Sequence, residues 1–289
     1  MKSLILTLLL VPVLACAKPI KRRTDVKQYP LLDMLTEVYL ENMTKAQDDW
    51  GFIESDKCDS LLFSGLLGSA GVRVWLYGAR DDDGRWYRRW QKDCYPDHSA
   101  SSISRDMLLG VLWYAWGNKR ADIAVNLLQY ADKHGYIMGE GPPSRVLMTP
   151  ALVNTTQLIA FKLGARKYAW KMPEIWAATP KGSARHIQML HILLRADVLG
   201  KLSPGAARRL KAIYKAEPKN VLFAAAHNYW IEDTWIPLHD YPMDRLPDSS
   251  DWSEPWRPQR AMGDSGRLPS LPLKYHSGGE IVFINHFLQ

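Results

Sequence analysis

The residues whose types and order could do chemistry begin with Arg105 and Asp106, which end a polar loop and open an apolar helix. Ser104 is a good N-cap, because its hydroxyl can accept a hydrogen bond from an unpaired amide of the first turn. Amide dipoles there hold a carboxylate ionised, which suits a base, nucleophile or ligand acceptor more than a general acid. Arg105 can bind a carboxylate or sulfate bidentately. The alternative is that Asp106 only complements the helix dipole.

Two more acids, Asp83 and Glu140, are candidates for the proton donor in a catalytic site where Asp106 acts as base or nucleophile. Asp83 lies in the segment 72–103, which has little helical signal, and Glu140 lies in a turn rich in Gly and Pro. A loop that long in a compact domain is more often functional than idle. If the predicted helices alternate strictly in direction, the three acids lie at one end of the protein.

Aromatic and charged residues supply a set of substrate-binding candidates. The chain has 12 Trp and 13 Tyr against 6 Phe, and such rings combine a flat apolar face with a polar handle that suits sugars. Strict alternation places the C-terminal candidates at the opposite end from Asp106, and one miscounted helix would bring them to the same end, so both arrangements stay open. The candidates are Arg105, Trp86, His98, Asp251, Trp252 and His276.

The spacing of apolar residues indicates an all-α fold that must position these side chains. Successive helical segments are joined mostly by short turns, with no strand between them. The expected helices are 31–45, 56–71, 104–116, 119–134, 149–163 with a start at Thr149-Pro150, 165–178 with a break near Pro173, 183–199 ending at Gly200, one that starts at Ser203-Pro204, one from Pro218 to about residue 231, and 280–288. This pattern predicts an α/α toroid-like array of about ten helices, or an irregular helical bundle, with two long irregular loops at 72–103 and 232–277. We expect residues 31–289 to form a single domain.

Three glycines, Gly65, Gly68 and Gly71, lie three residues apart on one face of the helix expected at 56–71. Their spacing resembles part of a dinucleotide fingerprint, but no strand precedes them. Small residues at this spacing favour close packing of two helices instead.

The first 17 residues have the pattern of a signal peptide, and residues 18–30 read as a polar linker. Lys2 precedes a short apolar run, and Ala15-Cys16-Ala17 has the form of a cleavage site. Residues 13–16 also resemble a lipobox, which would make Cys16 a lipidation site. We therefore expect an exported protein that is periplasmic, anchored to the outer membrane or secreted.

The remaining cysteines, Cys58 and Cys94, form an even pair in an oxidising compartment, which predicts a disulfide. The alternative is two unpaired buried thiols.

The net charge of +7 suits a partner that is anionic. An acidic polysaccharide, or a membrane reached through a lipid anchor, fits this charge, whereas no fold signature of a nucleic-acid-binding module is present. His186 and His191 are five residues apart and poorly aligned on a helix for a shared metal. Neither a G-x-S-x-G elbow nor a P-loop occurs, and we expect no metal and no cofactor.

Together with the helical pattern, the segments 81–86, 104–106, 251–252 and 276–279 resemble those of α/α-barrel and toroid proteins that act on carbohydrates, among them glycoside hydrolases and polysaccharide lyases. The tail also resembles those of uncharacterised exported bacterial and phage proteins. The likeness covers residues 31–289 in architecture, without a diagnostic catalytic motif. It implies an enzyme of the cell envelope with two carboxylates across a cleft. The alternative is a non-catalytic envelope lipoprotein that binds glycan or a protein partner.

Overall fold

The fold is mostly helical in a computed structural model of the chain, which describes residues 61–62, 65, 79–88, 94, 102–139, 145–169, 176, 184–218 and 220–232. The α-helices within these ranges are α4 (Arg105–Gly117), α5 (Ala121–Lys133), α6 (Pro150–Lys162), α7 (Ala184–Leu199), α8 (Pro204–Ala216) and α9 (Val221–His227). Shorter elements are the antiparallel pair β1 (Ile137–Gly139) and β2 (Val146–Leu147), the 3-10 helix η2 (Arg166–Tyr168) and the π-helix η3 (Asn228–Glu232).

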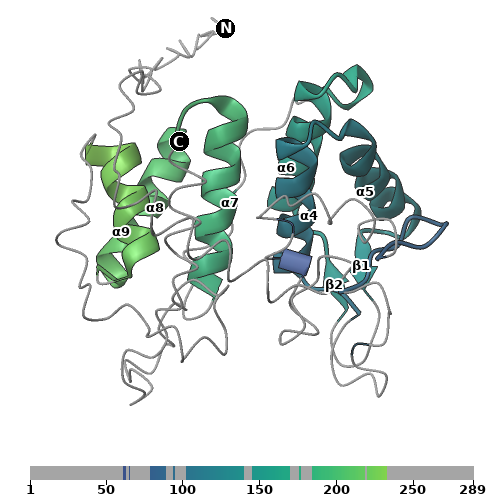
Figure 1. The fold of residues 1–289 in the computed structure, drawn as a ribbon, viewed down its shortest axis with the longest axis horizontal. Coiled ribbons are helices and arrows are strands. Elements are labelled where there is room, and N and C mark those ends of the chain that lie inside the picture. The colour runs from purple at the N-terminus through teal and green to yellow at the C-terminus, as the bar shows by residue number, and fades with distance from the viewer. Residues whose placement is uncertain are drawn as a thin grey trace, which may run out of the picture.

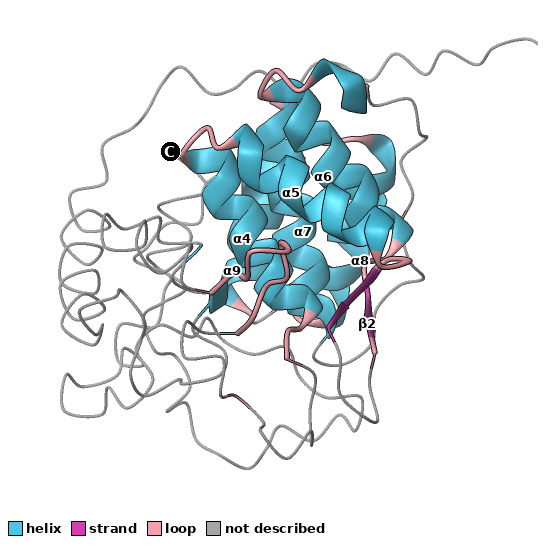
Figure 2. Ribbon diagram, turned by 90° about the vertical axis from the view of Figure 1, so that its right-hand side faces the viewer, coloured by secondary structure: helices cyan, strands magenta, loops and turns pink. Residues whose placement is uncertain are grey.

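Helix α4 lies at the centre of the described helices and contacts α5, α6 and α7 (Figure 1). The reason is its composition, since every residue from Met107 to Ala115 is buried and a helix that is apolar all round is stable only when surrounded. Helices α8 and α9 pack on each other and join the body through α7, on the side away from α5 (Figures 1 and 2).

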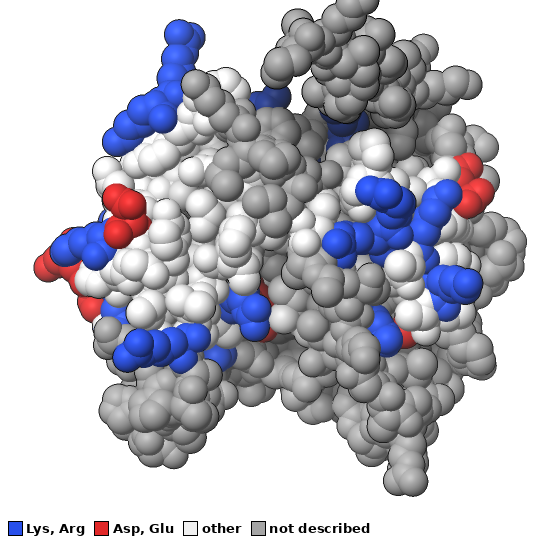
Figure 3. All heavy atoms as spheres, turned by 180° about the vertical axis from the view of Figure 1, so that it is seen from behind, with Lys and Arg blue, Asp and Glu red and all other residues white. Residues whose placement is uncertain are grey.

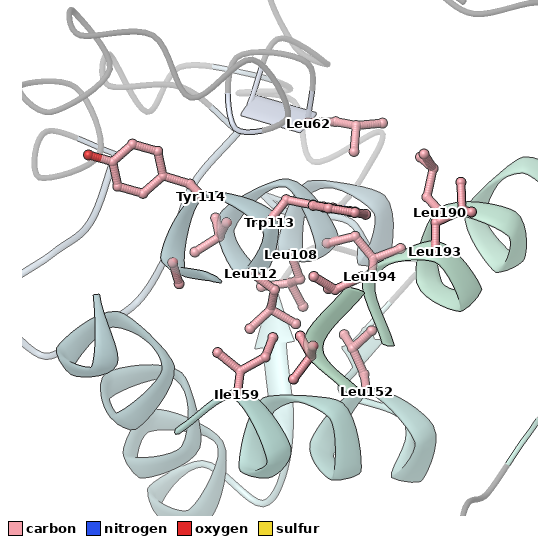
Figure 4. Close-up of a cluster of buried hydrophobic side chains, with 14 of the residues drawn as sticks. Leu62, Leu108, Leu112, Trp113, Tyr114, Leu152, Ile159, Leu190, Leu193 and Leu194 are labelled. Atoms are coloured by element: carbon pink, nitrogen blue, oxygen red, sulfur yellow. The ribbon is translucent and has the colours of Figure 1, made fainter. Parts of the chain in front are cut away.

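The core forms where α4, α6 and α7 meet (Figure 4). Leu108 and Leu112 of α4 face Leu152 and Ile159 of α6 across this region, and leucines of α7 complete it. These side chains are at most 3 % exposed. Burial of each stabilises the fold by about 1.5–3 kcal/mol, which explains why the three helices stay together.

A very close approach of two backbones lies beside this core. Leu61, Leu62 and Gly65 are helical, and a Cβ added to Gly110 of α4 would lie 2.6 Å from the Cα of Leu62 and 2.7 Å from the carbonyl oxygen of Leu61. A Cβ on Gly65 would collide with the carbonyl group of Gly110 in turn. The expected role of Gly65 in close helix packing is thus confirmed.

The helix ends follow the capping residues of the sequence. The side chains of Thr149 and Ser203 accept hydrogen bonds from the amides of Leu152 (3.4 Å) and Ala206 (3.0 Å), with Pro as the first residue of each helix. Gly200 ends α7 with a φ of +65°, a value that glycine adopts without strain. These three boundaries agree with the sequence-based prediction.

Other expectations differ from the structure. The turn expected at 139–143 is flanked in the sequence by β1 and β2, two strands that were not expected, and residues 140–144 lie outside the described ones. The helix expected at 165–178 is described only as the short η2 and the single residue Trp176. Helix α9 begins at Val221 rather than at Pro218, because the side chain of Asn220 caps it by accepting from the amide of Phe223. The helices expected at 31–45 and 280–288 lie outside the described residues, so the array of ten stays a prediction. No described helix is long and apolar enough to cross a membrane.

Candidate functional site

The segment with the Asp run folds into a tight hairpin over residues 79–88. Arg80 and Trp86 form a β-bridge, the amide of Asp81 donates to the carbonyl of Arg85 (2.8 Å), and Gly84 adopts a φ of +95°. A chain reversal of this kind favours Asp and Gly, because Asp hydrogen-bonds nearby amides and Gly permits positive φ. The carboxylate of Asp83 accepts from the amide of Arg85 (3.1 Å), so the turn holds its own acid in place.

Two sets of contacts fix this hairpin to the helical body. Trp86 is 1 % exposed, and its Nε1 donates to Oδ1 of Asn126 on α5 (3.1 Å). Ser102, two residues before the N-cap of α4, accepts from Nη2 of Arg85 at its hydroxyl (3.1 Å) and from the amide of Arg88 at its carbonyl (3.0 Å). The hairpin therefore lies on α5 and beside the start of α4.

Asp83 is one of two acids, with Asp82, that the hairpin presents to solvent. Its side chain is 44 % exposed, and its Oδ2 lies 4.0 Å from Nε2 of His134, whose ring stacks on Tyr130 with centroids 4.2 Å apart. Sequence reasoning missed His134. Its only signal was its place at the predicted end of the helix 119–134. A half-exposed carboxylate beside an imidazole can exchange a proton with a bound ligand or hydrogen-bond its hydroxyl groups.

Asp106 stands in the first turn of α4, as expected. Its Oδ1 accepts from the amide of Met107 (3.1 Å) and from the hydroxyl of Ser104, so Ser104 does not cap an amide through its side chain. Arg105 is exposed. One carboxylate oxygen of Asp106 thus stabilises its own helix start, which is the alternative role considered for it. The neighbouring Arg105 can reach a ligand.

Tyr87 adds a hydrogen-bonding group to the same hairpin. Its hydroxyl donates to Oδ2 of Asp81 (2.6 Å), and the guanidinium of Arg85 lies 5.0 Å from the ring centroid. Burial, together with the hydrogen bond to Asp81, raises the pKa of Tyr87 to about 12. The phenol therefore keeps its proton at neutral pH and serves as a donor, not as a base.

The start of α4, the hairpin and the strand that leads to Glu140 lie at one end of the helices (Figure 1). Helix α4 runs away from this end, and α5 returns to it after the turn at 118–120. Asp83, Arg105 and Asp106 thus share this end. The buried Trp86 anchors the hairpin and cannot stack on a sugar, which corrects the role expected for it. The candidates Glu140, His98, Asp251, Trp252 and His276 lie outside the described residues, as do Cys16 and Cys58.

A second polar cluster, which sequence reasoning did not find, is buried between α6 and α7. Nη1 of Arg195 donates to Oδ1 of Asn154 (2.6 Å) and to Oγ1 of Thr155 (2.9 Å), and Nε2 of His191 lies 2.6 Å from the same Oγ1. Asn154 and Thr155 are fully buried, so the cluster faces no ligand and holds the two helices together. Burial, with the nearby charge of Arg195, lowers the pKa of His191 to about 3.

Cys94 takes part in a disulfide, and its partner lies outside the described residues, so the pairing with Cys58 stays a prediction. Within the same described ranges, no three His, Cys, Asp or Glu side chains are grouped as metal ligands. Comparison with known proteins gives no further guidance, because no family model, no curated protein and no solved structure matches the chain.

Proposed function

We propose that this chain is an exported cell-envelope protein that acts on a glycan at the end of the helical body where the hairpin 79–88 meets the start of α4. The observation that carries the proposal is the placement of Asp83. This acid is half exposed on a hairpin that is hydrogen-bonded to Ser102. Ser102 lies just before Arg105 and Asp106 in the chain, so the hairpin is held beside the start of α4. Glycosidases use a pair of carboxyl groups about 5–10 Å apart, and this end of the helical body carries acids on two neighbouring segments.

In the catalytic form of the proposal, Asp106 acts as base or nucleophile while Asp83 or Glu140 donates the proton. Arg105 binds an acidic group of the sugar. The reaction is that of a glycoside hydrolase or a polysaccharide lyase. An α/α toroid-like array of about ten helices is the architecture we propose around this site, and the described helical body supports it as far as it extends. Export through the segment 1–17 and a lipid anchor at Cys16 complete the proposal.

The alternative is a non-catalytic envelope lipoprotein that binds a glycan or a protein partner at the same end. Two observations favour it. One carboxylate oxygen of Asp106 already accepts hydrogen bonds at the start of its own helix. Trp86 is buried and therefore does not form an exposed aromatic surface for a sugar. Both forms of the proposal share the same surface and differ in whether bonds are broken there.

The test is a screen of the purified mature protein against envelope polysaccharides, with measurement of binding, of new reducing ends and of the ultraviolet absorbance of unsaturated lyase products. Asp83→Asn should weaken binding or turnover at least about tenfold, because it removes the charge of the exposed acid while keeping its size. Asp132→Asn changes an exposed acid on α5 and is the matched control. Binding without products selects the non-catalytic form. A wild-type protein that neither binds nor cleaves any glycan rules out the catalytic form and glycan binding, and leaves only the protein-binding form of the alternative.

A further inference from the structure

One face of α8 carries a row of exposed basic residues. Arg208, Lys211 and Lys215 are three and four residues apart, so they lie above one another on a single side of the helix, and all three are exposed. Lys201, in the turn before α8, is exposed as well. Figure 3 shows Lys and Arg atoms gathered over the side of the molecule where Figure 1 places α8 and α9, with few Asp or Glu atoms among them.

Nothing in the described structure neutralises this row. None of the three side chains on α8 forms an ion pair with a described residue. The nearest acid along the chain, Glu217, is 3 % exposed and is bound to Nη1 of Arg185 (2.7 Å). Successive turns of a helix are about 5.4 Å apart, so the row presents positive charge at regular intervals along one line.

The surroundings of the row favour an extended anionic polymer over a membrane. Helices that dock on lipid combine basic residues with exposed apolar ones that enter the bilayer. The two large aliphatic residues of α8, Leu210 and Ile213, are buried in the protein. The large apolar side chains that are exposed in the described ranges are Tyr136, Leu147 and Phe161, none of them on α8.

We infer that the face of α8 formed by Arg208, Lys211 and Lys215 binds the acidic groups of a linear polysaccharide. This inference rests on the proposed function and deepens it, since it makes the glycan an acidic one. The face lies on α8, on the other side of the body from α5 and its hairpin (Figure 1). It therefore supplies a second contact that holds a long chain on the protein, separate from the site around Asp83.

The experiment measures binding of the full mature chain to immobilised polygalacturonate at several salt concentrations. Reversing all three charges (Arg208→Glu, Lys211→Glu, Lys215→Glu) should weaken binding on the order of tenfold or more at low salt and flatten its salt dependence, because fewer counterions are released. A control with the same change in net charge reverses three exposed lysines elsewhere, Lys133, Lys162 and Lys167. Circular dichroism should show both variants folded, since every substituted side chain is exposed.

Equal losses in both variants would overturn the inference, because net charge and not the α8 face would then govern binding. It is also overturned if the wild-type protein does not bind polygalacturonate, or if phosphatidylglycerol vesicles or duplex DNA bind at least as tightly and depend on the same three residues. In those cases the proposed function survives if another glycan is bound and Asp83→Asn weakens that binding. It fails separately if no glycan is bound at all.

Discussion

At the scale of single residues, the hydroxyl of Thr155 explains the arrangement between α6 and α7. The hydroxyl donates to the carbonyl of Ala151 (3.0 Å), which leaves both lone pairs to accept from Arg195 (2.9 Å) and from Nε2 of His191 (2.6 Å). This pattern requires a proton on Nε2, and a second proton on the ring would place two cations in a buried site. The arrangement therefore selects neutral His191.

The low pKa of His191 predicts a loss of stability in mild acid. The unfolded chain takes up a proton as the pH falls below about 6.5, whereas the folded protein does not do so until about pH 3. The stability that neutral His191 contributes to the folded protein is thus present above about pH 6.5 and is lost progressively below it. We expect the free energy of unfolding to fall by about 2 kcal/mol between about pH 7.5 and about pH 5. Urea unfolding at the two pH values measures this change.

His191→Gln should remove most of that pH-dependent loss, although it lowers stability at neutral pH by disturbing the cluster. His134→Gln, which changes a partly exposed histidine outside the cluster, should keep the wild-type loss. If His191→Gln and the wild type lose the same stability in acid, His191 is not the group responsible.

At the scale of elements, α4 organises the described fold because it is buried on all sides and carries a glycine where another helix crosses it. The backbone at Gly110 lies against Leu61 and Leu62 so closely that no side chain fits between them. Such close packing stabilises the fold through dispersion attraction between many atom pairs. It also leaves no space for a single added methyl group.

Gly110→Ala should therefore destabilise the protein by about 2 kcal/mol or more, because the new Cβ would force the two backbones apart. Gly117→Ala is the matched control at the end of the same helix, where a Cβ would meet nothing within 4 Å. That change should be neutral or stabilise by up to about 1 kcal/mol. Thermal unfolding followed by circular dichroism compares the two variants, and equal melting temperatures would contradict the close crossing.

At the scale of the whole molecule, the sequence predicted those features that local chemistry determines. The starts of α6 and α8 were predictable because Thr149-Pro150 and Ser203-Pro204 are capping pairs, and the apolar run of α4 indicated its central place. The hairpin 79–88 was expected only as an irregular loop, because its anchoring depends on Trp86 reaching Asn126, forty residues further along the chain. The buried cluster around Thr155 was missed for the same reason.

The disulfide of Cys94 gives a prediction at this scale. Pairing with Cys58 would link the helix expected at 56–71 to the segment 72–103, which carries the hairpin, and closing a loop of that length stabilises the fold by about 4 kcal/mol on the chain-entropy model. Mass spectrometry of a non-reducing digest should show the two cysteine peptides joined. Free alkylation of Cys58 would contradict this pairing.

The central claim is that Asp106 belongs to a glycan site and is more than a helix cap. Asp106→Asn keeps the size of the side chain and removes its charge, so the most direct measurement compares glycan binding or turnover of this variant with its melting temperature. We predict that binding or turnover is lost while the melting temperature stays within a few degrees of the wild-type value, since a helix N-terminal charge contributes only about 0.3–1 kcal/mol. A variant that melts much earlier yet acts on the glycan as the wild type does would contradict the account and leave Asp106 as a structural cap.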